Sequence, residues 1–342
     1  MNRYLLIDTM NLFFRVRHTS HKDASLLDRL GMSMHIMLAS ANKVVRNVNV
    51  DHVIFALEGK NNWRKTFYTP YKRQRADKLQ KRTESEVEKD DLYFEYFNYL
   101  IEYIDKETNC SVISAYGAEA DDVIARTIAL HPDDEFVILS SDTDYYQLIS
   151  DKVTQYNGIT SELITLDGFF KDNGKPVIDK KTKLAKIFED PEWILFEKCI
   201  RGDKSDNIFS AYPGARKKGT KNKAGLLEAF ADKNKKGYDW NAVMLHRWTD
   251  HLGKEHRVVD DYERNRKLID LSLQPDDVID SVDTSIITAL IDNVESRKLP
   301  RQIGFKFMKF CGRHDLVKLA ERPDEVISWL NKEYKGHINE YN

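Results

Sequence analysis

The sequence predicts an α/β protein in which a mostly parallel sheet is flanked by helices. Short apolar runs recur along the first half of the chain, each bounded by polar or turn residues, and longer amphipathic segments lie between them. Strands that alternate with helices favour a parallel sheet covered on both faces. The expected strands are YLLI (4–7), HVIFAL (52–57), CSVISA (110–115), EFVIL (135–139) and KVTQY (152–156).

Helical patterns separate these strands and then dominate the second half of the chain. Amphipathic helices are expected near 25–47, 85–105 and 118–130. From about Pro191 onward the patterns are mainly helical. We therefore expect an α/β domain over residues 1–185 and a helical subdomain over residues 186–342.

The composition is typical of an intracellular globular protein. The 342 residues are 41% hydrophobic and 32% charged, with a net charge of −2. The three cysteines are far apart and show neither a disulfide framework nor metal-type spacing. No apolar run approaches the roughly 20 residues of a membrane helix, and Asp8 interrupts the early apolar stretch, which argues against a signal peptide. We expect a cytoplasmic protein. The sequence contains no glycine-rich phosphate-binding loop, so it does not imply a nucleotide cofactor.

Carboxylates follow four of the expected strands, at the point where each strand ends. Asp8 follows YLLI, Glu58 follows HVIFAL, and further acids lie in EADDVIA and SSDTD after the next two strands. The carboxyl ends of parallel strands meet along one edge of a sheet, so we expect these side chains to converge. The seven residues are Asp8, Glu58, Glu119, Asp121, Asp122, Asp142 and Asp144.

Carboxylates that converge either take up protons or bind cations. Oxygen ligands without cysteine or paired histidine favour Mg²⁺ or Mn²⁺ over zinc, and several of them suit two-metal hydrolysis of a phosphodiester. The alternative is that each acid only caps the helix that follows it. Repetition at four strand ends favours the metal site. A further pair in RGDKSDNI, Asp203 and Asp206, is either part of a second metal site or an ordinary loop and helix cap.

Two segments are strongly basic. Residues 60–82 hold nine Lys or Arg and one acidic residue, with four aromatic residues interleaved. Residues 213–225 (PGARKKGTKNKAG) hold five basic residues and no acidic one. Basic side chains bind phosphates and aromatic rings stack on unpaired bases, so both segments are candidate nucleic-acid contacts. The alternative for each is a solvated surface loop, and we expect 60–82 to be exposed.

Four motifs together resemble the phage and bacterial 5′-nuclease family of flap endonucleases. They are LLIDTMNLFFR, GAEADDVIA, SSDTDYYQLI and IRGDKSDNI, in the family's order and at similar separations. The resemblance covers roughly residues 1–235. It extends to RKLPRQIGFKFMKF (297–310) for the ribonuclease H branch of the family in T-even bacteriophages. It implies the PIN-like 5′-nuclease fold, with a basic arch at about 60–95, a C-terminal helical subdomain, and a helix–hairpin–helix-like element at about 200–236 that binds DNA.

The resemblance also implies two Mg²⁺ ions, for which Mn²⁺ can substitute. Asp8, Glu119, Asp121 and Asp142 would hold one ion, and Asp144, Asp203 and Asp206 the other, with Asp122 able to serve either. Glu58 departs from the family, which usually has Asp after the second strand.

The basic residues also take roles from the resemblance. Lys72 and Arg75 would steady charge on the reacting phosphate, Arg64 would contact phosphate, and Tyr71 would stack on a base. The full set expected to bind DNA is Arg64, Lys65, Tyr71, Lys72, Arg73, Arg75, Arg216, Lys217, Lys218, Lys221 and Lys223.

The function that follows is a structure-selective, metal-dependent 5′→3′ exonuclease and flap endonuclease. It would act on DNA and on RNA–DNA hybrids with 5′ flaps or nicks, and remove RNA primers in replication. By resemblance it would be a monomer of phage type in the host cytoplasm, with a single-strand-binding protein and a sliding clamp as partners. One alternative is a PIN-like ribonuclease that acts on single-stranded RNA. Another is a DNA-binding protein without catalytic activity.

Overall fold

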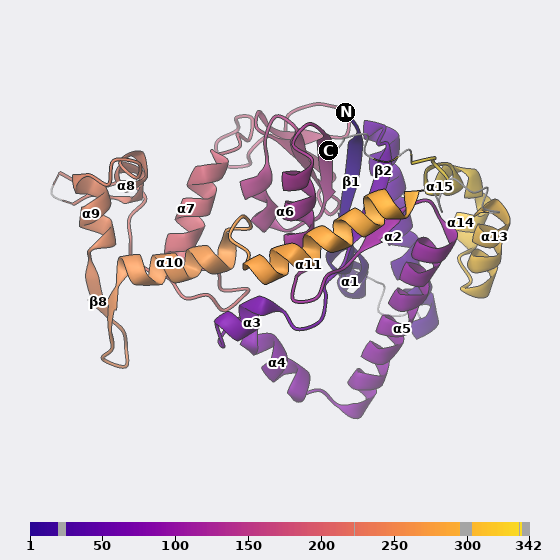
Figure 1. The fold of residues 1–342 in the computed structure, drawn as a ribbon, viewed down its shortest axis with the longest axis horizontal. Helices are drawn as coiled ribbons and strands as arrows, with labels where there is room; N and C mark the ends of the chain where they lie inside the picture. Colours follow the sequence, from indigo (N-terminus) through magenta and orange to yellow (C-terminus); the bar gives the residue numbers. More distant parts are fainter. Residues whose placement is uncertain (20–24, 222, 295–302, 335, 337–342) are drawn as a thin grey trace. The chain divides into compact units, whose positions relative to one another are not determined.

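A computed structural model describes the chain except residues 20–24, 222, 295–302, 335 and 337–342. The chain forms two compact units (Figure 1). The sheet unit comprises Met1–Asn62, Arg82–Phe188 and Pro275–Asn342, and the helical unit comprises Trp63–Lys81 and Glu189–Gln274. Among the described residues, no helix is both long and apolar enough to cross a membrane.

The sheet unit contains a seven-stranded sheet in the order β3-β2-β1-β4-β5-β6-β7. The first five strands in the chain run parallel: β1 (Arg3–Asp8), β2 (His52–Ala56), β3 (Ser111–Ile113), β4 (Glu135–Leu139) and β5 (Val153–Asn157). The five expected strands and the mostly parallel sheet are therefore confirmed. Two antiparallel strands beyond β5, β6 (Glu162–Thr165) and the edge strand β7 (Gly168–Lys171), were not expected.

Helices of the sheet unit begin where the sequence provides caps. The helix α2 (Leu26–Val48) starts with a capping box between Ser25 and Asp28, and α5 (Glu84–Glu107) with one between Thr83 and Glu86. These two helices and α6 (Ala120–Leu130) confirm the three expected helices. The unit also contains α1 (Thr9–Thr19), the 3₁₀ helix η1 (Thr143–Leu148), α11 (Asp276–Ile287) and the π-helical turn η2 (Thr288–Asp292).

The C-terminal helices belong to the sheet unit. They are α13 (Ile303–Arg313), α14 (Val317–Glu321) and α15 (Pro323–Leu330), which lie beside α2 and α5 (Figure 1). Their buried residues Phe307 and Leu330 join the same apolar core as Leu5 of β1 and Phe97 of α5. Residues 297–302 of the segment RKLPRQIGFKFMKF (297–310) lie outside the described residues.

The helical unit has its own apolar core. Its elements are α3 (Trp63–Phe67), α4 (Arg73–Gln80), α7 (Pro191–Arg201), α8 (Leu226–Ala231), α9 (Tyr238–Met244), α10 (Val258–Ile269) and the hairpin of β8 (Arg247–Thr249) with β9 (Glu255–Arg257). Trp193, Phe196 and Leu226 are buried together with Tyr71 from the basic segment.

This grouping differs from the division expected at residues 185 and 186. Part of the basic segment packs with the second half of the chain, because Tyr71 lies in that core and buried Arg64 donates from Nε to the Leu268 carbonyl at 2.9 Å. The expectation that residues 60–82 are exposed is wrong for these two side chains, of which Arg64 is only 2% exposed.

Candidate active site

The sheet register brings the predicted acids of the sheet unit to one edge. Asp8 is the last residue of β1 and pairs with Ala56, the last residue of β2, which precedes Glu58 by two positions. On the other side of β1, Ile7 pairs with Leu139 at the end of β4. Glu119 is the N-cap of α6, and Asp142 is the N-cap of η1. Asp121, Asp122 and Asp144 follow in the first turns of these two helices.

Ser140 links the acid of β1 to the turn after β4. Its Oγ donates to Asp8 Oδ2 at 2.9 Å and accepts from the Asp142 backbone N–H at 3.0 Å. Gln155 of β5 fixes the same turn, because its Nε2 donates to the Ser140 carbonyl at 3.0 Å and to the Asp142 carbonyl at 2.7 Å. Asp8, Ser140 and Gln155 are all buried, so this part of the edge is held by hydrogen bonds that are shielded from water.

Tyr145 lies among three of the acids. Its hydroxyl donates to Asp121 Oδ1 at 2.5 Å, and the residue is fully buried. Burial raises the pKa of the Tyr145 phenol well above its usual range, and the charges of Asp121, Asp8 and Asp142 raise it further. The phenol therefore remains a hydrogen-bond donor to Asp121 at neutral pH. Sequence reasoning missed this residue, although Tyr145 follows directly on the D-x-D motif.

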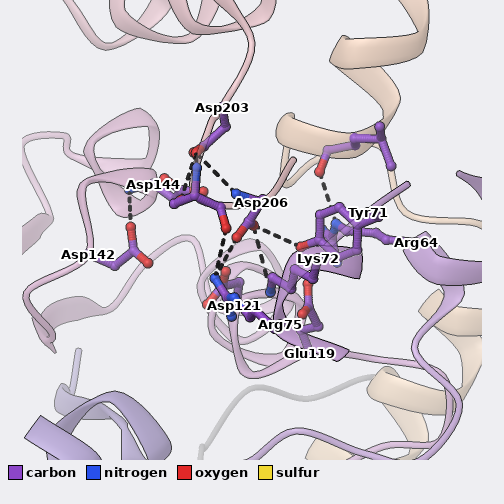
Figure 2. A network of polar contacts seen from close by, with 12 residues as sticks. Arg64, Tyr71, Lys72, Arg75, Glu119, Asp121, Asp142, Asp144, Asp203 and Asp206 are labelled. Carbon is purple, nitrogen blue, oxygen red and sulfur yellow. Dashed lines mark hydrogen bonds and ion pairs between the residues drawn. The ribbon is translucent and has the colours of Figure 1, made fainter. Parts of the chain in front are cut away.

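The capping alternative holds for Asp8, whose Oδ1 accepts from the Asn11 backbone N–H of α1 at 3.4 Å, and for two further acids. Asp122 Oδ2 accepts from the Glu119 backbone N–H at 2.9 Å. Asp142 Oδ1 accepts from the Asp144 backbone N–H at 3.0 Å (Figure 2). A capping carboxylate retains its second oxygen, so capping and metal binding are compatible at both positions.

Glu58 differs from the other acids because its side chain is exposed. The turn that carries it packs tightly against the loop before α6, since the Gly59 backbone N–H donates to the Ala118 carbonyl at 2.9 Å. A Cβ at Gly59 would lie 1.8 Å from the Ala115 carbonyl oxygen, so the turn requires glycine. Glu58 therefore projects from a rigid turn next to the Glu119 loop, without the buried bonds that hold Asp8.

The helical unit contains the remaining two acids in the turn after α7. Asp203 Oδ1 accepts from the Ser205 backbone N–H at 2.7 Å and from its Oγ at 2.6 Å, while Lys198 Nζ lies 2.9 Å from Oδ2. Burial alone would raise the pKa of Asp203, but Lys198 and the Ser205 hydrogen bonds lower it to about 2.

Asp206 is bound by the residues predicted to act on phosphate. Arg75 Nη2 lies 2.6 Å from Oδ1, while the Tyr71 hydroxyl and Lys72 Nζ lie 3.1 and 3.7 Å from Oδ2 (Figure 2). The Lys72 backbone N–H also donates to the Asp206 carbonyl at 2.8 Å, with Lys72 in the left-handed region at φ +52°. Lys72 and Arg75 thus contact a predicted metal ligand of the same unit. The sequence did not predict this contact, because more than 130 positions separate these residues from Asp206.

The described residues of the second basic segment, 213–221 and 223–225, form a largely exposed loop before α8. Its basic side chains are all exposed: Arg216, Lys217, Lys218, Lys221 and Lys223. Glu228 organises the loop, because its Oε2 accepts from the backbone N–H groups of Gly219 at 2.9 Å and Gly225 at 3.0 Å. Lys65 and Arg73, the other two predicted contacts, are also exposed in the helical unit.

The donor set of the edge fits a hard cation, because every candidate ligand is a carboxylate oxygen. Within the described residues, however, no three His, Cys, Asp or Glu side chains are grouped closely enough to hold a metal ion. Protein donors occupy several of these oxygens instead, including Ser140 on Asp8 and Tyr145 on Asp121.

Comparison with known proteins places the chain in a family. The model of the 5′–3′ exonuclease N-terminal resolvase-like domain matches residues 3–174, which is 172 of the 342 residues. The flap endonuclease of Escherichia phage T5 is 25% identical over 206 residues, which are 60% of this chain and 63% of that protein. A DNA polymerase I of Helicobacter pylori is 27% identical over 205 residues, 59% of this chain and 20% of the polymerase. The chain thus aligns with less than two thirds of either relative.

Solved structures show the same fold. A T5 5′-exonuclease with bound zinc has a TM-score of 0.57 at 21% identity, covering 84% of this chain and 99% of that one. A complex of the T5 flap endonuclease with DNA and metal ions has a TM-score of 0.52 at 19% identity, covering 94% of this chain and all of that one. Because the family model spans half of the sequence, the chain belongs to the family of 5′–3′ exonucleases with an N-terminal resolvase-like domain.

Proposed function

We propose that the protein is a metal-dependent, structure-selective 5′→3′ exonuclease and flap endonuclease. Its substrates would be DNA and RNA–DNA hybrids with 5′ flaps or nicks, and its role the removal of RNA primers. The family match and the phage relative support this proposal. The observation that carries it is the row of acids at the carboxyl edge of the sheet. Two of these acids, Asp8 and Asp121, come from separate segments of the chain and accept hydrogen bonds from Ser140 and Tyr145 respectively.

For the metals we propose two Mg²⁺ ions, replaceable by Mn²⁺. Asp8, Glu119, Asp121 and Asp142 would bind one, with Glu58 nearby, and Asp144, Asp203 and Asp206 the other, with Asp122 at either. When bound, such ions supply an activated water and charge neutralisation on phosphate. The sheet unit contributes rigidity, because Ser140 and Tyr145 donate to the carboxylates of Asp8 and Asp121, and Ser140 also fixes the backbone of Asp142.

The basic residues would bind and orient the phosphodiester. Lys72 and Arg75 carry the charge for the reacting phosphate, and Arg75 is the more exposed of the two, at 56% against 16%. Since Arg64 and Tyr71 are buried, we assign them positioning roles instead of direct contacts. Arg64 anchors α3 to the Leu268 carbonyl, and Tyr71 orients Asp206.

The exposed loop 214–225 would hold duplex DNA through its phosphates. Its basic side chains can contact phosphate without reading bases, so the binding would be independent of sequence. Lys65 and Arg73 would add to the same electrostatic attraction. We further propose that the protein acts as a monomer in the cytoplasm of a phage-infected host, with a single-strand-binding protein and a sliding clamp as partners.

Substrate preference tests the proposal. End-labelled 5′-flap DNA, nicked duplex, RNA–DNA hybrid and single-stranded RNA would be incubated with the protein and Mg²⁺, and the products sized. The proposal predicts cleavage near the flap junction and release of 5′ products from nicks and hybrids. Faster cleavage of the single-stranded RNA would instead support a PIN-like ribonuclease.

A further inference from the structure

A groove lies between the end of α5 and the helix α13, both in the sheet unit. Its volume is about 400 Å³, within the range of ligand sites. The lining residues that could contact a ligand include Tyr99, Tyr103, Phe305, Lys309, Phe310 and Arg313. The groove adjoins the end of α5 that leads into β3, whereas the predicted acids follow the carboxyl ends of the strands. This α5–α13 groove is therefore separate from the candidate active site.

Aromatic side chains line the α5–α13 groove. Tyr103 and Phe310 stack on each other with ring centres 4.3 Å apart and an interplanar angle of 19°. Phe305 is 70% exposed and Tyr99 is 41% exposed, so both rings are accessible to a ligand. The Tyr103 hydroxyl is buried and has no hydrogen-bond partner among the described residues.

The charge of the α5–α13 groove is positive. Four Lys or Arg and two Glu side chains line it, which gives 4 − 2 = +2 in a chain whose net charge is −2. The two acids are already neutralised, because Glu102 pairs with Lys106 at 2.6 Å and Glu107 pairs with Lys306. Lys309 and Arg313 are exposed, and no ion pair links either to a carboxylate in the described part of the chain.

The two cations without ion pairs are arranged along one line. Lys309 and Arg313 lie four residues apart on α13, which is about 6 Å along a helix axis. Phe305 lies four residues before Lys309 on the same face. This row of two cations and an exposed ring is complementary to a polymer in which anionic groups alternate with flat aromatic groups, because the cations can bind the anions and the ring can stack.

We propose that the α5–α13 groove binds single-stranded nucleic acid, with Lys309 and Arg313 on successive phosphates and Phe305 and Tyr99 against bases. Such binding combines cationic contacts to the backbone with sequence-tolerant stacking. The assignment to nucleic acid, in preference to an acidic peptide, rests on the proposed nuclease function. The site would hold an unpaired strand at a distance from the metal-binding acids.

Binding without metal tests the groove separately from cleavage. Full-length protein in EDTA would be titrated against a fluorescein-labelled oligothymidylate, with anisotropy as the readout. Phe305→Ala should weaken binding about fivefold or more, which is the cost of one lost base stack. Lys309→Glu with Arg313→Glu should weaken binding at least tenfold and reduce the slope of log K against log salt by about 1.4. Lys318→Glu, an exposed charge reversal on α14, is the matched control and should change little.

Unchanged oligonucleotide affinity in the groove variants, with thermal melting as in the wild type, would overturn the proposal. Equal weakening by Lys318→Glu would also overturn it, because the effect would then be general electrostatics. A third contrary result is loss of binding to a tyrosine-containing oligoaspartate while oligonucleotide binding persists, which would mark a protein-docking site. Cleavage of nicked duplex with Mg²⁺, measured in parallel, decides the proposed nuclease function independently of all three results.

Discussion

The Tyr145 hydroxyl offers a sharp perturbation of the candidate metal site. Tyr145→Phe removes one oxygen and leaves a fully buried ring in place, so packing is nearly preserved. The hydrogen bond that is lost, 2.5 Å to Asp121 Oδ1, has an ionised acceptor. Bonds of this kind contribute about 1.5–3 kcal/mol. Removing a partner that orients a metal ligand typically lowers metal affinity about 10–100-fold.

Metal binding can be measured without cleavage. Mn²⁺ would be titrated into the DNA-free protein, with free Mn²⁺ followed by electron paramagnetic resonance. We expect the affinity of the tighter site to fall at least tenfold in Tyr145→Phe. Tyr146→Phe is a matched control in the same 3₁₀ helix, because its ring packs on Phe169 and Phe188 and its hydroxyl donates to no acid among the described residues.

Two results would refute this reasoning. One is unchanged Mn²⁺ affinity in Tyr145→Phe when melting in EDTA shows a folded protein. The other is an equal loss of affinity in Tyr146→Phe, which would indicate general loosening of η1. Because the pKa of Tyr145 is raised, the phenol stays protonated, so the difference between the variants should persist across neutral pH.

Three further predictions concern the acids and the turns that carry them. The pKa of Asp203 falls from 3.8 to about 2 on folding. Its ionised form therefore contributes about 2 kcal/mol to the free energy of unfolding above pH ~4, and this contribution is lost toward pH ~2. In Lys198→Met the free energy of unfolding, measured with urea in EDTA, should depend less on pH over this range. Gly59→Ala should lower stability by about 3 kcal/mol or more through its clash with a carbonyl oxygen at 1.8 Å, whereas Gly312→Ala, with open space around its Cβ, should not lower the melting temperature. Arg75→Met should reduce single-turnover flap cleavage about 100-fold, yet change the unfolding free energy by less than about 1 kcal/mol, because its ion pair is partly exposed.

The sequence alone was sufficient to predict the five parallel strands and the edge at which the acids gather. Most of these strands are short buried apolar runs, and parallel topology then determines where the following residues lie. The antiparallel strands β6 and β7 were missed because they are only four residues long and carry no distinctive apolar run. The assignment of the C-terminal helices to the sheet unit also escaped prediction, since the contact of Phe307 with the core near Leu5 spans 302 positions.

Composition misled most in the basic segment. Its charge suggested exposure throughout, but Tyr71 and Arg64 find a core and a carbonyl acceptor in residues 189–274 that no local pattern reveals. Tyr145 was overlooked for the opposite reason. The sequence pattern suggests only that a tyrosine after a strand packs in the core, and the three-dimensional structure is needed to show that its hydroxyl donates to Asp121.

Cleavage of a 5′-flap DNA by wild type, Asp121→Asn and Asp133→Asn, each with Mg²⁺ and with EDTA, tests the central claim most directly. Asp133 is an exposed acid of the sheet unit in the turn before β4, 78% exposed, and serves as the matched control. We predict that wild type and Asp133→Asn cleave only with Mg²⁺, and that Asp121→Asn loses at least 100-fold in rate while remaining folded. Intact cleavage by Asp121→Asn, or cleavage by wild type in EDTA, would contradict the assignment of the sheet-edge acids as a metal-dependent nuclease site.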